Sequence, residues 1–193
     1  MAYPEAYQEC RRRVYAFWHH VQRGWPEFQR FKIARTAYWL GVRESTRIVG
    51  EYVLTLHDLR AGLSRQEHPD IITIADHSID RHGTGGIGGE MMEPYGVPYR
   101  CLIPKGFKNL LIACRGASFS SIAASSCRLS RTMMQLGQAA GTAAAIAQEQ
   151  SVMLPDVPPE MLRARLREQH AQLAWPVMEE LAVYLKDETP IQG

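Results

Sequence analysis

The stretch HGTGGIGGE, residues 82–90, is rich in glycine, and Gly83–Gly88 within it matches the pattern G-x-G-x-x-G. That pattern binds the pyrophosphate of a dinucleotide when a buried strand leads into it and a helix follows, because the helix turns its free N–H groups and positive end toward the phosphates. Here residues 76–82 are polar and charged, and residues 90–98 contain two prolines and a glycine. Neither flanking element is expected, so the sequence predicts a glycine-rich loop and no phosphate cradle.

A second stretch of small residues is a better candidate for a nucleotide-binding segment. The apolar run Asn109–Arg115 reads as a short buried strand, a turn of small residues follows, and a long helix is expected over Thr132–Gln150. Gly137 and Gly141 share one face of that helix, although a glycine inside a helix costs about 1 kcal/mol relative to alanine. Either a ligand approaches the backbone there or the face packs tightly in a core, and composition leaves both open.

Five sequence blocks within residues 36–150 carry a resemblance to a known family. In order, they are Gly41–Tyr52, Ser78–His82, Pro98–Lys105, Asn109–Arg115 and Gly137–Ala145. Together they resemble the C-terminal half of FAD-dependent oxidoreductases that have a glutathione-reductase-like FAD domain, a group related to fumarate reductase and succinate dehydrogenase flavoproteins. The resemblance implies an α/β or α+β fold with an incomplete FAD-binding domain of that type, part of a substrate or cap domain, and a helical C-terminal tail.

The resemblance also implies a site for FAD. In the family, the strand matching residues 109–115 belongs to the FAD-binding sheet, and the N-terminus of the helix matching 137–146 points at the flavin ring. A reduced flavin carries negative charge over N1 and the C2 carbonyl, which a helix N-terminus stabilises through unpaired N–H groups and about half a positive charge. The predicted cofactor-binding residues are Ala113, Arg115, Arg128, Gly137, Gln138, Ala139, Ala140 and Gly141.

Candidate catalytic residues are Arg43, Arg47 and His82, because flavin enzymes use protein side chains to orient substrate and move protons. The two arginines precede a predicted strand and could clamp a carboxylate or a flavin phosphate, or pair with a nearby glutamate instead. His82 follows Asp80 by two residues, so on extended backbone the two share a face. The carboxylate could then tune the imidazole as an acid or base. For Arg115 and Arg128, a surface role is as plausible as a contact with the cofactor.

The sequence departs from the family in two places. Cys114 stands where the family often has glycine, and its larger side chain could crowd the cofactor. Nothing in residues 1–35 resembles the family's dinucleotide fingerprint. We therefore expect the chain to be the distal part of a flavoprotein, whether a split subunit, a truncated reading frame or an excised piece, which needs an N-terminal FAD-binding half as partner and acts on a small-molecule substrate.

A non-catalytic remnant of the same scaffold is the alternative hypothesis. Such a module would expose apolar strand edges and the alanine-rich face of the helix over Thr132–Gln150, so it should self-associate or bind another protein. A homo-oligomer is one form of that expectation.

Hydrophobic periodicity and turn residues outline the remaining elements. The predicted domains are a helical segment over 1–40, a β-rich substrate-side segment over 41–104, the strand and helix of the FAD-binding domain over 105–150, and a helical tail over 151–193. A polar loop is expected over 59–70 and a turn over Pro104–Gly106. Helices are predicted over Tyr7–Val21, Glu27–Leu40, Glu160–Gln169 and Val177–Lys186, and strands over Arg47–Thr55, Ile71–Ile74 and Tyr99–Ile103.

Composition narrows the class of protein. The 193 residues are 46% hydrophobic and 22% charged with a net charge of +2, which gives no electrostatic case for nucleic acid or for an anionic membrane. The four cysteines form no C-x-x-C, so neither a zinc site nor a disulfide framework is predicted. The N-terminus lacks the order of a signal peptide, and the longest uncharged run has 17 residues, fewer than a membrane span needs. We expect a soluble, cytoplasmic protein.

Overall fold

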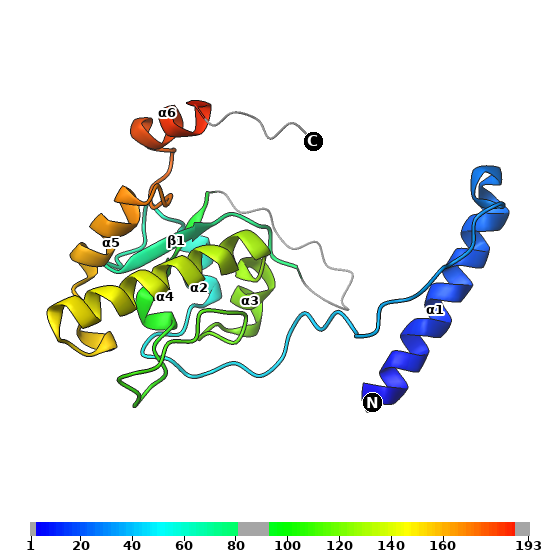
Figure 1. Ribbon diagram of the computed structural model, residues 1–193, viewed down its shortest axis with the longest axis horizontal. Helices are drawn as coiled ribbons and strands as arrows, with labels where there is room; N and C mark the ends of the chain where they lie inside the picture. The colour runs from blue at the N-terminus through cyan, green and yellow to red at the C-terminus, as the bar shows by residue number, and fades with distance from the viewer. Residues whose placement is uncertain (1–2, 81–92, 188–193) are drawn as a thin grey trace. The chain divides into compact units, whose positions relative to one another are not determined.

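The computed structural model describes residues 3–80 and 93–187 (Figure 1). The chain divides into two compact units, residues 1–43 and residues 44–193. The predicted glycine loop and His82 lie outside the described residues. Among the described residues there are several helices and one two-stranded sheet, a mixture compatible with an α/β or α+β class. No helix in this part of the chain is long and apolar enough to cross a membrane.

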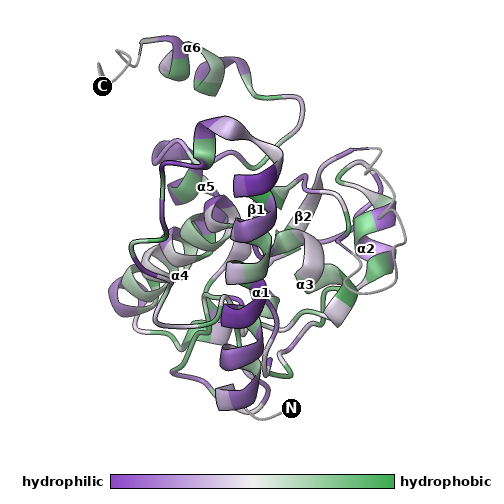
Figure 2. Ribbon diagram, turned by 90° about the vertical axis from the view of Figure 1, so that its right-hand side faces the viewer, coloured by the Kyte–Doolittle hydropathy of each residue, from purple (hydrophilic) through white to green (hydrophobic). Residues whose placement is uncertain are grey.

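The first unit contains helix α1, Tyr3–Gly24, as the periodicity predicts. Glu9 supports the helix by pairing with Arg12 and Arg13 at 2.7 Å, one turn further on. Most of α1 is hydrophilic, with a smaller number of hydrophobic residues between the polar ones (Figure 2). No residue described between 3 and 43 is buried.

The predicted helix over residues 27–40 is wrong. After the 3-10 turn η1, Pro26–Phe28, the chain is irregular and runs back along α1. The ring of Phe28 meets Trp18 edge-on at 5.9 Å, and the amide of Leu40 donates to the Tyr3 hydroxyl at 3.0 Å. A helix from residue 28 to 40 would reach only about 18 Å, less than the roughly 22 Å of α1 between these two contacts. The extended chain spans that length.

The sheet of the second unit pairs β1, Ile71–Ala75, with β2, Tyr95–Pro98, in antiparallel register. The strand predicted at 71–74 is confirmed, whereas the one predicted at 99–103 is wrong. The chain leaves the sheet after Pro98 and forms the 3-10 turn η2, Tyr99–Cys101. The turn is closed by the Leu102 amide, which donates to the carbonyl of Tyr99 at 2.8 Å, and the Tyr99 amide donates to the carbonyl of Asp70 at 2.7 Å.

The strand predicted over residues 47–55 is only partly formed, because the segment has isolated β-bridges at Gly50 and Leu54 and a bend at residues 51–52 between them. The Glu51 amide donates to the carbonyl of Ile103 at 3.0 Å and the Leu54 amide to that of Ser118 at 3.0 Å, so the segment lies between two other stretches of chain. Each neighbour forms only one isolated β-bridge with it, and no regular strand results.

Helix α2, Leu56–Ala61, occupies part of the region where a loop was expected over 59–70. The missed signal is Thr55-x-x-Asp58, a capping box in which the two side chains and backbones bond reciprocally. The predicted turn over Pro104–Gly106 is present, closed by a 3.0 Å bond from the Phe107 amide to the Pro104 carbonyl, with Gly106 at a φ of +84°.

Four helices and a short turn complete the second unit. The predicted helices over 132–150, 160–169 and 177–186 are confirmed. Helix α3 lies in the stretch read as a small-residue turn, and the Ser120 side chain caps it by accepting from the Ala123 amide at 3.2 Å. α4 packs against β1 and against α5, which places the core between this helix layer and the sheet. The bounds are α3 Ser121–Cys127, α4 Ser130–Gln150, η3 Leu154–Asp156, α5 Pro159–Glu168 and α6 Glu179–Asp187.

The predicted buried strand over Asn109–Arg115 is wrong. This stretch has no regular secondary structure and is half-buried or exposed along its whole length, with Leu110 41% exposed. The Ile112 amide donates to the carbonyl of Leu102 at 2.8 Å. A strand buried in a parallel sheet needs neighbours on both sides. The described part of the chain supplies no such sheet beside this stretch.

Candidate functional site

The start of α4 is the feature with the clearest capacity to hold an anion. Leu129, which precedes the helix, makes no capping hydrogen bond with its side chain, and the first turn contains no acidic residue. The first N–H groups of a helix have no partner within it, and the aligned peptide dipoles place about half a positive charge there. This helix therefore keeps a positive end that the side chains of its own cap and first turn do not neutralise.

A cavity of about 460 Å³ opens at that end of α4. Its volume falls within the range of about 300–1,000 Å³ that is common for small-molecule sites. The lining combines two methionines and a thiol with two guanidinium groups, so it can contact an apolar ring and a negative charge together. The lining residues are Cys114, Arg115, Arg128, Ser130, Met133 and Met134.

Arg128 is held in place beside this cavity. One nitrogen of its guanidinium lies 2.5 Å from the Oδ2 atom of Asp80, and the Nε atom donates to the carbonyl of Ser125 at 3.3 Å. Only 11% of the Arg128 side chain is exposed. The predicted pairing of Asp80 with His82 is untested, because His82 lies outside the described residues, but Asp80 does have a cationic partner.

The predicted cofactor residues of α4 lie away from the helix start. The helix begins at Ser130, so Gly137 is seven residues further on, or about 10 Å along the axis. Gly137 and Gly141 are exposed, and a Cβ added at either would meet nothing within 4 Å. The backbone at both glycines therefore lies open. None of the described residues from 137 to 141 lines the cavity.

Two neighbours of these glycines have partners within the chain. Gln138 donates from Nε2 to the Oε1 atom of Gln169 at 3.2 Å. Ala139 is 0% exposed and packs in the core. Ala140 and, on the preceding stretch, Ala113 are half-buried against the same core.

The candidate catalytic arginines are not brought together by any contact that the structure describes. Arg47 lies 3.6 Å from the Oε2 atom of Glu44, so the ion pair considered from the sequence is present. Glu44 also accepts from the Ser121 hydroxyl at 2.8 Å, which ties this pair to the start of α3. Arg43 is the last residue of the first unit.

A partly buried polar network that the sequence did not reveal holds the segment 47–55 through Tyr52 and Thr55. Asp58 accepts from the Tyr52 hydroxyl at 2.6 Å and lies 3.0 Å from Nε2 of His68. Nδ1 of His68 lies 3.3 Å from Arg100, which pairs with Asp70 at 3.0 Å. These bonds join α2, η2 and the segment before β1.

The pKa values follow from this network. Burial raises the pKa of Asp58, but hydrogen bonds from Tyr52, His68 and Thr55 outweigh it, and the net pKa lies below the ordinary value. Burial, aided by the bond to Asp58, raises the pKa of Tyr52. The network therefore holds an ionised carboxylate and a neutral phenol.

The cysteines divide by environment. Cys101 and Cys127 are buried, and burial raises the pKa of Cys127 to about 12, so neither is a reactive thiol near neutral pH. Cys114 is exposed and lines the cavity at the start of α4. Within the described residues, no cluster of three or more histidines, cysteines and acids could hold a metal ion.

Comparison with known proteins gives one result. The sequence profile described as FAD dependent oxidoreductase matches residues 1–166, a range that includes the N-terminal stretch in which no fingerprint was found. No curated protein and no solved structure matches the chain.

Proposed function

This chain belongs to the FAD-dependent oxidoreductase family, and from that membership we propose that it supplies the flavin-facing helix end and the substrate side of such an enzyme, built on a glutathione-reductase-type FAD domain. FAD, when bound, supplies the hydride and electron transfer. The observation that carries the proposal is the cavity at the start of α4, where the positive helix end meets Arg115 and Arg128.

The residues around this cavity fit the chemical groups of a flavin. The first amides of α4 stabilise negative charge, which a reduced flavin carries. Met133 and Met134 offer polarisable side chains to an aromatic ring. Arg128, oriented by its ion pair with Asp80, offers guanidinium N–H donors for a phosphate or a carbonyl oxygen. Arg47 with its partner Glu44, Arg43 and His82 stay proposed as substrate-side residues.

An N-terminal FAD-binding half or subunit completes the proposed enzyme. The G-x-G-x-x-G at Gly83–Gly88 has the wrong flanking sequence for a phosphate cradle, and no other such pattern occurs in the chain. The half-exposed, apolar stretch Asn109–Arg115 supports this proposal, because it has the composition of a strand buried in a parallel sheet and would join the sheet of that partner.

Reconstitution tests the proposal. The full chain is purified alone and together with a family N-terminal half that carries the strand–glycine–helix fingerprint, each with added FAD. We expect little bound flavin with the chain alone and a flavin band near roughly 450 nm in the complex after gel filtration, since the cofactor brings its own absorbance. A complex that forms but retains no flavin would contradict the proposed function.

A further inference from the structure

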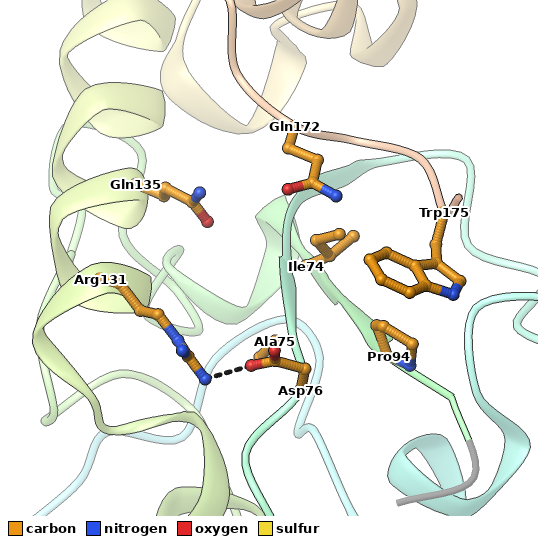
Figure 3. A pocket seen from close by; sticks show the side chains of 8 residues that line it. All are labelled: Ile74, Ala75, Asp76, Pro94, Arg131, Gln135, Gln172 and Trp175. Carbon is orange, nitrogen blue, oxygen red and sulfur yellow. Dashed lines mark hydrogen bonds and ion pairs between the residues drawn. The ribbon is translucent and has the colours of Figure 1, made fainter. Parts of the chain in front are cut away.

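A second, smaller cavity borders the first turns of α4 at Arg131 and Gln135, which do not line the first cavity (Figure 3). We propose that it binds a small uncharged ring that presents a cyclic amide edge, a carbonyl next to an N–H group. Its volume is about 190 Å³, and it shares no lining residue with the cavity assigned to the flavin. The proposal therefore stands apart from the proposed function. The lining residues are Ile74, Ala75, Asp76, Pro94, Arg131, Gln135, Gln172 and Trp175.

Two amide side chains converge on this cavity from opposite elements. Gln135 extends from α4 and Gln172 from the segment after α5 (Figure 3). The Oε1 atom of Gln135 accepts from the hydroxyl of Thr73, which is 1% exposed and fixed in β1. The Nε2 group of Gln135 is therefore the group left to donate to a ligand in this cavity.

Gln172 supplies the complementary group. Its Nε2 atom donates to the carbonyl of Ala174 at 3.4 Å, which directs its Oε1 atom to act as the acceptor. One donor and one acceptor thus face the same space. A cyclic amide satisfies both at once, because its carbonyl accepts from Gln135 while its N–H donates to Gln172.

The walls select a flat and neutral ligand. The indole of Trp175 stands beside Pro94, with Ile74 behind them, and together they form an apolar side against which a ring can stack (Figure 3). Asp76 and Arg131 form an ion pair at the edge of the cavity, so their charges compensate each other. The volume lies below the roughly 300–1,000 Å³ of sites for larger ligands, which restricts the occupant to about one ring.

Trp175 provides a direct readout. The chain has four tryptophans, and Trp175 is the one within residues 44–193. In a proton–nitrogen correlation spectrum of the full chain without flavin, the indole signal of Trp175 is assigned by its loss in Trp175→Phe. Uracil, a cyclic amide of one ring, should shift this signal in a saturable way and leave the other three indole signals in place.

A matched ligand and matched variants make the test specific. In 1,3-dimethyluracil the ring and carbonyls remain but both N–H donors are lost, so binding should weaken at least about tenfold because an acceptor is left unpaired. Gln135→Leu and Gln172→Leu should weaken uracil binding similarly. Gln148→Leu, an exposed position on the same helix away from the cavity, should not. Melting temperatures verify that each variant is folded.

Three results would overturn the proposal. They are a Trp175 signal that does not respond to millimolar uracil, equal binding of the dimethylated ring, and full uracil binding by a folded Gln135→Leu or Gln172→Leu variant. Because no flavin is present, none of these results bears on FAD binding at the other cavity.

Discussion

Single residues determine whether the positive start of α4 can meet an anion. Ser130 stands at the first helical position and lines the cavity, and the first turn lacks any acid. A carboxylate introduced here would improve the helix, because acids at helix N-termini stabilise it by about 0.3–1 kcal/mol. The same charge would oppose a reduced, negatively charged flavin. Stability and cofactor binding should therefore respond in opposite directions.

We expect Ser130→Asp to keep or raise the melting temperature of the chain and to lower flavin retention in the reconstituted complex. Ser130→Asn is the matched control, since it has nearly the same shape without the charge and should retain flavin. Differential scanning calorimetry and the flavin absorbance of the gel-filtered complex are the two measurements. Equal flavin retention by the Asp and Asn variants would remove the helix start from the flavin site.

The ionisation of Asp58 makes the free energy of unfolding depend on pH. Its pKa in the folded protein is lowered, so its contribution is present above the unfolded-state value of about 3.9 and is lost as the pH falls through the folded-state value. Asp58→Asn should therefore destabilise the chain clearly at pH 7 and much less at pH 3. Urea unfolding at both pH values measures this. A pH-independent difference would contradict the assignment, and Asp156→Asn, at an exposed acid, is the control.

At the scale of elements, local sequence predicts the long helices α1, α4 and α5 of this chain, but it adds a helix over 27–40 and misses the short helices α2 and α3. Of the four predicted strands, only the one over 71–74 forms a regular strand. Helices α4, residues 130–150, and α5, residues 159–168, can be predicted from their own residues, because helical hydrogen bonds join residues only four apart in the sequence. The stretch 109–115 has a strand composition, yet strands need partners that are distant in sequence. The candidate site shows the same division. The sequence predicted the helix α4 to within two residues of its start and named Arg128 as a candidate, but it placed the candidate ligand contacts at 137–141, away from the cavity at the helix start.

Gly137 in α4 and Gly50 in the segment 47–55 provide a matched test of packing, because the first glycine faces open space and the second is closely surrounded. Gly137→Ala should stabilise the chain by about 1 kcal/mol, because the added methyl group meets open space and alanine favours the helix. Gly50→Ala should destabilise it by about 1–3 kcal/mol, since its Cβ would lie 2.7 Å from Ser118 and 3.0 Å from the carbonyl of Ile103. Urea denaturation gives both values. Equal effects at the two positions would contradict the described packing.

At the scale of the whole molecule, the two units differ in what they bury. Every buried residue that the structure describes lies in the second unit, 44–193, whereas the first unit is held by contacts between α1 and the chain after it. The first unit also carries a net charge of +5 against −3 for the second, a contrast that the overall +2 conceals. The core that gives the chain its stability therefore belongs to one unit.

Residues 44–193 expressed alone should accordingly melt within a few degrees of the full chain, because no described core residue is removed. Calorimetry of both forms at the same concentration makes the comparison. A drop of about 5 °C or more, which corresponds to roughly 1.5–2 kcal/mol in domains of about 150–250 residues, would show that the first unit contributes to the stability of the core.

The amino-acid sequence by itself determined the family, through ordered blocks across the chain, and the long helices α1, α4 and α5, through a periodicity that each segment carries alone. Only the tertiary structure decided that a cavity lies beside the start of α4, that residues 109–115 have no strand neighbours within the described residues, and that Gln135 faces Gln172. The physical reason is the distance along the sequence between the residues that interact. Helical hydrogen bonds close within one turn, whereas cavities, strand pairing and converging side chains depend on residues that are distant in the sequence.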